Sequence, residues 1–183
     1  VDILPKDIDA EIQKAKVGRM ALEKLLRELL VPGVDYDRVP GTDKPTLLKS
    51  GAELLCQVFH LAPGKIDILH AVEDPQTGFL SYHVGVPIYH RDTGILVAYG
   101  IGAANSKEPK YRYRKTITDE GEQVRTENPD PFGEQNTLIK MAAKRGFVDG
   151  VIKATGASRM FTQDAEDLLL PEKASKKQLD YLR

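Results

Sequence analysis

Two stretches of alternating residues, separated only by a short turn, constrain the fold of this chain more than any other feature. In the first stretch, 79–89, every second residue is large and apolar: Leu80, Tyr82, Val84, Val86 and Ile88. The second, 95–103, alternates Ile95, Val97, Tyr99 and Ile101 with Leu96, Ala98, Gly100 and Gly102. A period of two predicts β-strands, and the intervening Arg91-Asp92-Thr93-Gly94 predicts a hairpin turn.

The glycines of the second strand predict a close approach. Gly100 and Gly102 share one side of that strand, and Gly85 lies in the strand before it. Glycine inside a strand marks a position where another backbone or a helix comes near. The sequence Gly100-Ile101-Gly102 also begins like a dinucleotide-binding fingerprint, but prolines and charges follow it instead of an amphipathic helix, so we set that interpretation aside.

Other segments predict the remaining elements. Alternation over 66–73 predicts a strand before the hairpin, and apolar residues at helical spacing predict a helix over 8–30 with Asp7 as N-cap. Ser50-Gly51-Ala52-Glu53 has the form of a capping box at the start of a second helix. Asp130-Pro131 predicts the start of a long helix that ends at Thr155 before Gly156, and a short last helix is expected over 162–170.

The resulting fold class is α+β. We expect a three-stranded antiparallel β-meander packed by a long helix (a β-β-β-α core), with N-terminal helices and a short C-terminal helix. Residues 1–170 form one domain and 171–183 a polar tail. Residues 118–134 carry six acids and one base and predict a solvated loop. The sheet has two edges that no proline visibly blocks, which predicts a homo-oligomer, a ring or filament built by sheet extension.

Composition excludes several classes of protein. Cys56 is the only cysteine, so an internal disulfide or a multi-thiolate metal site is excluded and a reducing compartment is expected. No apolar run reaches the length of a membrane-spanning helix, and the first ten residues lack the features of a signal peptide. We therefore expect a soluble, cytoplasmic protein with no membrane partner.

The first basic cluster is Lys107-Glu108-Pro109-Lys110-Tyr111-Arg112-Tyr113-Arg114-Lys115. In an extended conformation its tyrosines would project to one side and its arginines to the other. Aromatic rings stack on bases and basic side chains neutralise phosphates, as in proteins that bind single strands without sequence preference. The alternative is a solvated edge strand whose charges prevent aggregation.

The second basic cluster lies on the predicted long helix. Lys140 and Lys144 are four residues apart and share a face, with Arg145 and Lys153 nearby. Their alternative interpretation is an ordinary solvated helix face. Two strongly basic clusters in a chain with 26 bases and 27 acids favour a binding surface.

Signals for catalysis are weaker. The four histidines share no metal-ligand spacing with acids, and no serine or cysteine lies in a nucleophile motif. Asp164, Glu166 and Asp167, together with Glu53, could hold Mg²⁺ as nuclease carboxylates do, but acids in a first helical turn also suit the helix dipole. We expect no catalytic residue, no metal and no cofactor.

The strands around Tyr82-His83-Val84-Gly85-Val86 and Leu96–Gly102, followed by a basic segment and the helix sequence Lys140-Met141-Ala142-Ala143-Lys144-Arg145-Gly146, resemble the core of the Rad-fifty-two-type single-strand annealing proteins. The stretches 105–114 (Asn-Ser-Lys-Glu-Pro-Lys-Tyr-Arg-Tyr-Arg) and 161–164 (Phe-Thr-Gln-Asp) are also similar to a group of bacterial and phage proteins.

The annealing resemblance implies an oligomeric ring that binds single-stranded DNA in a basic outer groove without metal or nucleotide. By position, Lys140, Lys144, Arg145 and Lys153 would match the helix bases of that groove, and Arg112 and Arg114 those of the hairpin side. The expected function is single-stranded DNA binding and strand annealing in recombination or repair, with a single-strand-binding protein as a candidate partner. The alternatives are a metal-dependent nuclease, or a structural or adaptor subunit of a phage or mobile-element complex.

Overall fold

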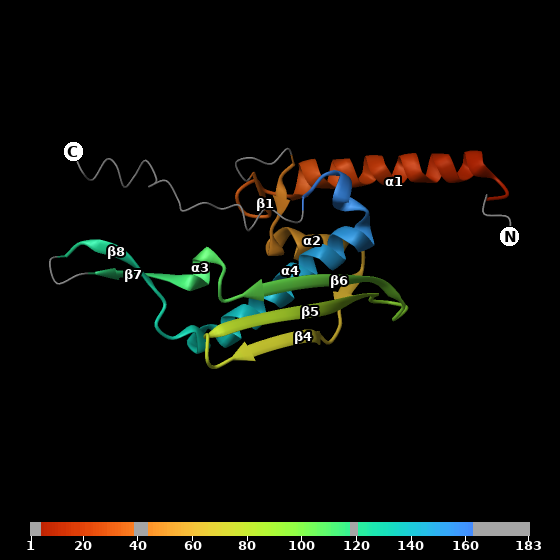
Figure 1. The fold of residues 1–183 in the computed structure, drawn as a ribbon. Helices are drawn as coiled ribbons and strands as arrows, with labels where there is room; N and C mark the ends of the chain where they lie inside the picture. The colour runs from red at the N-terminus through yellow and green to blue at the C-terminus, as the bar shows by residue number, and fades with distance from the viewer. Residues whose placement is uncertain (1–4, 39–43, 118–120, 163–183) are drawn as a thin grey trace, which may run out of the picture.

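The sheet of this protein is built around one long central strand. The computed structural model describes residues 5–38, 44–117 and 121–162 (Figure 1). Strands β4 (Asp67–Asp74) and β6 (Leu96–Asn105) pair antiparallel with opposite edges of β5 (Phe79–His90). The short β3 (Leu61–Pro63) pairs with the last residues of β5, on the same edge of β5 as β4. The sheet thus has four strands, whereas the sequence predicted three. The strand β3 was missed because three residues are too few to show alternation in sequence.

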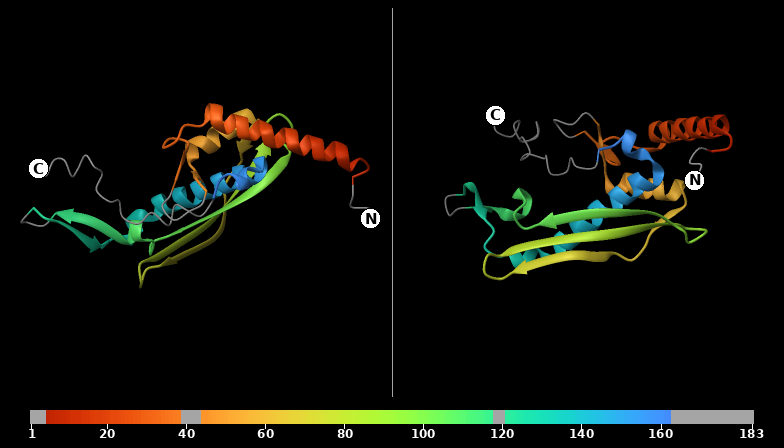
Figure 2. Two further views of the ribbon diagram at one scale, coloured as in Figure 1. Left: turned by 90° about the horizontal axis from the view of Figure 1, so that it is seen from above. Right: turned by 45° about the vertical axis from the view of Figure 1, so that its right-hand side comes forward.

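Helices cover one face of the sheet. Helix α4 (Gln135–Thr155) crosses that face, and α1 (Ile8–Leu29) and α2 (Lys49–Val58) lie on the same side of the sheet (Figure 2). The connection between α1 and α2 contains the two-residue strands β1 (Tyr36–Asp37) and β2 (Thr46–Leu47). The predicted mixture of helices and antiparallel strands, with a long helix after the sheet, is confirmed.

Helix boundaries follow capping in two of three cases. The Asp7 side chain accepts the N–H of Ala10 at 2.9 Å and begins α1. Asp130 caps the 3-10 turn η1 (Pro131–Glu134) that leads into α4, and Gly156, at φ 68°, ends α4 in the left-handed conformation. The capping box predicted for α2 is wrong: the helix begins at Lys49, and the Ser50 hydroxyl donates instead to the carbonyl of Val34 at 2.5 Å.

Four glycines bring α4 into backbone contact with the sheet. A Cβ on Gly100 would overlap the carbonyl oxygen of Gly146, and one on Gly102 would overlap the carbonyl oxygen of Ala142. From the helix side, a Cβ on Gly150 would lie 2.7 Å from a side-chain carbon of Ile88. The predicted close approach is confirmed, and it accounts for the glycines without any nucleotide.

The acidic segment 118–134 is not simply a loop, because part of it forms a strand; its residues 118–120 lie outside the described ranges. Helix α3 (Pro109–Arg112) leads into β7 (Tyr113–Ile117), and β8 (Gln123–Glu127) pairs with it antiparallel. This hairpin projects beyond the sheet (Figure 1). Glu127 of β8 lies opposite Tyr113 of β7 and pairs with Arg112 of α3, a long-range contact that charge counting along the sequence does not detect.

Some predictions fall outside the described ranges. The chain is described through the turn η2 (Ala157–Arg159) and on to Thr162, so the rest of the helix expected over 162–170 and the tail 171–183 lie beyond it. Among the described helices, none has the length and apolar content needed to cross a membrane.

Candidate nucleic-acid interface

The first basic cluster does not adopt the extended alternation expected of it. Tyr111 belongs to α3, is only 4% exposed and packs in the core. Its ring is not available to stack on a base, so its predicted place on an extended binding strand is wrong. Pro109 at the start of α3 favours a helical turn here, since its fixed φ suits a first helical position.

The arginines of this cluster are already engaged with acids. Arg112 Nε lies 3.0 Å from Glu127 Oε1, and this bond raises the pKa of the guanidinium further. Arg114 lies 2.9 Å from Glu134. The guanidinium groups of Arg112 and Arg125 lie 5.2 and 4.8 Å from the centre of the Tyr113 ring. These contacts lower the positive potential that phosphates would meet, and they occupy the Tyr113 ring.

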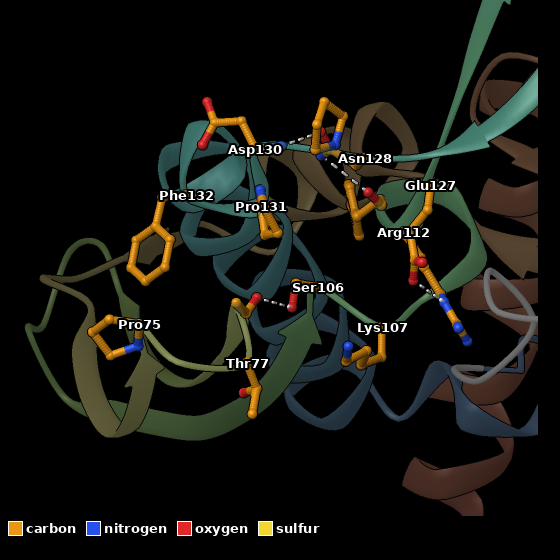
Figure 3. Close-up of a pocket in the computed structure, with 13 residues that line it drawn as sticks. Pro75, Thr77, Ser106, Lys107, Arg112, Glu127, Asn128, Asp130, Pro131 and Phe132 are labelled. Carbon is orange, nitrogen blue, oxygen red and sulfur yellow. Dashed lines mark hydrogen bonds and ion pairs between the residues drawn. The ribbon is translucent and has the colours of Figure 1, made fainter.

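The remaining lysines of the cluster are exposed. Lys107 follows β6, Lys110 lies with its ammonium group 5.6 Å from the centre of the Tyr111 ring, and Lys115 is on β7. Lys107 and Arg112 line a hollow of about 650 Å³ between the β4–β5 turn, α3 and η1 (Figure 3). On its other side the hollow is walled by Pro75 and by the Phe132 ring, which is 37% exposed. An aromatic wall here was missed, because Phe132 lies outside both basic clusters.

The bases of α4 divide between two sides of the helix. At 3.6 residues per turn, Lys140 and Lys144 share one side, whereas Arg145 and Lys153 lie on another. Lys153 Nζ lies 2.6 Å from Asp149 Oδ2, on the side that faces the edge of β6. The expectation that Arg145 lines the same groove as Lys140 and Lys144 is wrong.

Arg145 instead joins α4 to the end of β6. Its guanidinium binds both carboxylate oxygens of Glu108, at 2.8 and 2.9 Å, and donates to the carbonyl of Ala103 at 2.5 Å. Four residues along, the Asp149 carboxylate accepts the backbone N–H of Ile101 at 2.8 Å. These two side chains bind backbone groups on the outer edge of β6, so the expectation that both sheet edges are open is wrong there.

We predict that Arg145→Gln lowers the free energy of unfolding by about 2 kcal/mol, because it breaks a bidentate, mostly buried ion pair and leaves the Glu108 carboxylate without its cationic partner. Urea denaturation measures the loss. The matched change Lys140→Gln, at an exposed position on a different side of α4, should have a much smaller effect. Equal losses in the two variants would mean that Arg145 has no special structural role.

Lys140 and Lys144 line a different cavity, a groove of about 830 Å³ between α2, the β3 segment and α4. We call it the α2–α4 groove. Lys49 of α2 and Arg91 of the β5–β6 turn also line it, so four bases from three parts of the chain meet at one cavity. Among the described residues that line it, Glu53 is the only acid, and it lies 3.2 Å from Lys49. Arg91 is held by a 3.1 Å hydrogen bond to the carbonyl of Leu61.

Apolar side chains also line the α2–α4 groove. Three of them also belong to the hydrophobic core: Val86 of β5, Phe147 of α4 and Leu61 of β3. Ile66, which is 39% exposed, adds an apolar surface at the rim. A groove with basic and apolar walls suits a polyanion that also carries apolar faces.

Cys56 lies at the same groove and supplies a probe of it. Burial raises the pKa of its thiol to about 11, against a weaker lowering by Arg91. At pH 9 we therefore expect roughly 1% of this thiol to be ionised in the folded protein, against about half in the unfolded chain. The folded state keeps the proton that the unfolded chain loses near pH 9, so this group lowers stability as the pH rises from about 9 to about 11.

Alkylation by iodoacetamide at pH 9, with and without urea, checks this expectation. The native protein should react far more slowly than the unfolded chain. Equal rates would mean that the thiol is not buried as described.

The predicted site residues are therefore not brought into one groove. Within the described ranges, the α2–α4 groove and the hollow beside α3 share no lining residue. Lys49 and Arg91 were missed as site residues, because they lie far from both clusters in sequence and no local pattern marks them. Over residues 5–38, 44–117 and 121–162, no group of three or more His, Cys, Asp or Glu side chains is placed to hold a metal.

Comparison with known proteins adds no family assignment. No protein-family model matches the chain, and no curated protein matches its sequence.

Proposed function

We propose that this protein binds single-stranded DNA in the α2–α4 groove and promotes the pairing of complementary strands without breaking a bond. The observation that carries the proposal is the convergence of Lys49, Arg91, Lys140 and Lys144 on one cavity with apolar walls. Basic side chains neutralise phosphates, and apolar and aromatic surfaces accept the faces of unstacked bases. A duplex hides those faces, so single strands should bind more tightly than duplex.

Strand annealing requires no catalytic group. A groove that holds a backbone extended, with base edges exposed, presents them to a second strand and lowers the entropic cost of pairing. The likeness to single-strand annealing proteins supports this proposal through the order of strands, basic segment and long helix. Beyond the groove, the bound DNA would contact Lys107, Lys110 and Lys115.

Titration of a labelled single-stranded oligonucleotide at low salt, beside the duplex of the same sequence, tests the proposal. We expect tighter binding of the single strand and faster annealing of two complementary strands. Equal binding of single strand, duplex and poly-glutamate, with no gain in annealing rate, would reject it. That result would favour the adaptor alternative, in which the bases bind acidic proteins.

We further propose that the functional form is a homo-oligomer. Strand β4 lies at the sheet edge opposite β6, with most of its residues exposed. A ring made by joining β4 of one copy to β6 of the next would require Arg145 and Asp149 to release the β6 backbone, whereas pairing of two β4 strands would not. Light scattering at micromolar concentration should give a mass above that of the 20.3 kDa monomer. A monomer mass at low salt would contradict this part of the proposal.

A further inference from the structure

A second cavity, of about 450 Å³, lies between α1 and the C-terminal end of α4. We call it the α1–α4 groove. Its apolar wall includes Ile12, Ala15 and Leu22 of α1 together with Met160. Ile12 is 42% exposed although it lies on the same stripe of α1 as the buried Leu22. Exposed apolar surface in a hollow of this kind is typical of a binding surface.

The described charged residues of the α1–α4 groove all have the same sign. Lys16 and Arg19 of α1 and Arg159 of η2 line it, and no acid of the described part of the chain does. Arg19 lies 3.5 Å from Glu23 at the next turn of α1. The matching ligand is a peptide that carries several carboxylates next to large apolar side chains.

The sequence of this chain contains such a peptide directly after the groove. Residues 163–170 read Gln-Asp-Ala-Glu-Asp-Leu-Leu-Leu, with three acids followed by three leucines. Met160 lines the groove, and the described chain ends two residues later at Thr162, whose N–H donates to the carbonyl of Pro45 at 2.9 Å. Eight residues can reach about 26 Å when extended. A tether this short gives the peptide a local concentration in the millimolar range.

We propose that residues 163–170 bind in the α1–α4 groove of their own chain. The leucines cover the wall formed by Ile12, Ala15 and Leu22, and the carboxylates of the segment lie against Lys16, Arg19 and Arg159. Bound in this way, the segment joins α1 to the end of α4. In this proposal Asp164, Glu166 and Asp167 hold the segment in the groove and do not bind a metal.

The absence of tryptophan from the chain permits a direct test. Leu169→Trp introduces a single fluorophore into the full-length protein, and Gln178→Trp provides a reference position in the polar part of the C-terminus. We expect the emission of Leu169→Trp to be shifted to the blue of the reference and to be less quenched by iodide. Adding Lys16→Glu and Arg159→Glu should shift it back to the red.

The matched control is Lys14→Glu with Lys24→Glu, which makes the same change of charge on α1 residues that do not line the groove. It should leave the blue shift in place, and circular dichroism should show both combinations folded. Emission equal to the reference would overturn the proposal, as would a blue shift that survives the groove variants. A blue shift that disappears on dilution would also overturn it, by showing that the segment binds a second copy.

Discussion

Replacing Gly100 by alanine is expected to lower the free energy of unfolding by about 3 kcal/mol. The added methyl group would overlap the carbonyl oxygen of Gly146, and Gly150 Cα would lie only 2.7 Å from it. Both are backbone atoms in the middle of α4, so no side-chain rotation can relieve the clash, and the helix must move away from the sheet. Overpacked cores lose about 1–3 kcal/mol, and a backbone overlap belongs at the upper end of that range.

A comparison with Gly18 controls for the general effect of a glycine-to-alanine change. Gly18 lies in α1 with no atom within 4 Å of an added Cβ, so Gly18→Ala should stabilise the protein by about 0.5–1 kcal/mol through helix propensity. Urea denaturation of both variants measures the two effects. A neutral or stabilising Gly100→Ala would contradict the close packing of α4 on β6.

The second large effect concerns DNA. The double variant Lys140→Gln, Lys144→Gln should lose affinity for single strands by roughly 60-fold at about 50 mM salt, since each lost phosphate contact changes log K by about 0.7 times the logarithm of the salt concentration. Glutamine keeps most of the side-chain stem, so the apolar wall of the groove is preserved. Titration of a labelled oligonucleotide measures the change.

The control for this variant is Lys14→Gln, Lys24→Gln, which removes the same charge from the exposed surface of α1. It should bind as the unmodified protein does. Equal losses in the two double variants would mean that net charge, and not the α2–α4 groove, governs binding.

The sheet and its helix could be predicted from sequence because their signals are local. The alternation of Leu80 to Ile88 and the glycines at 100 and 102 specify a buried strand face and a close contact, whatever the rest of the chain does. Caps at Asp7 and Gly156 likewise depend on a few neighbouring residues. The prediction of a capping box at Ser50 was wrong because the Ser50 hydroxyl donates to the carbonyl of Val34, which lies sixteen residues away in the sequence.

The candidate site could be predicted only in part, because it depends on distant pairings. Lys140 and Lys144 were found from their spacing on one helix face, but Lys49 and Arg91 join them only through the packing of α2 and the β5–β6 turn against α4. Tyr111 and Arg145 are residue types that often bind nucleic acids. Here Tyr111 is a core side chain, and Arg145 pairs with Glu108. Local composition does not distinguish a base that binds a ligand from a base that binds its own protein.

The salt dependence of single-strand binding tests the central claim, that the α2–α4 groove binds phosphates, most directly. Affinity is measured over a series of salt concentrations for the unmodified protein and for Lys140→Gln, Lys144→Gln. The account predicts a plot of log K against log salt that is flatter by about 1.4 in the variant, since two phosphate contacts are lost at about 0.7 each. Identical slopes in a folded variant would contradict the claim, because they would show that neither lysine contacts a phosphate.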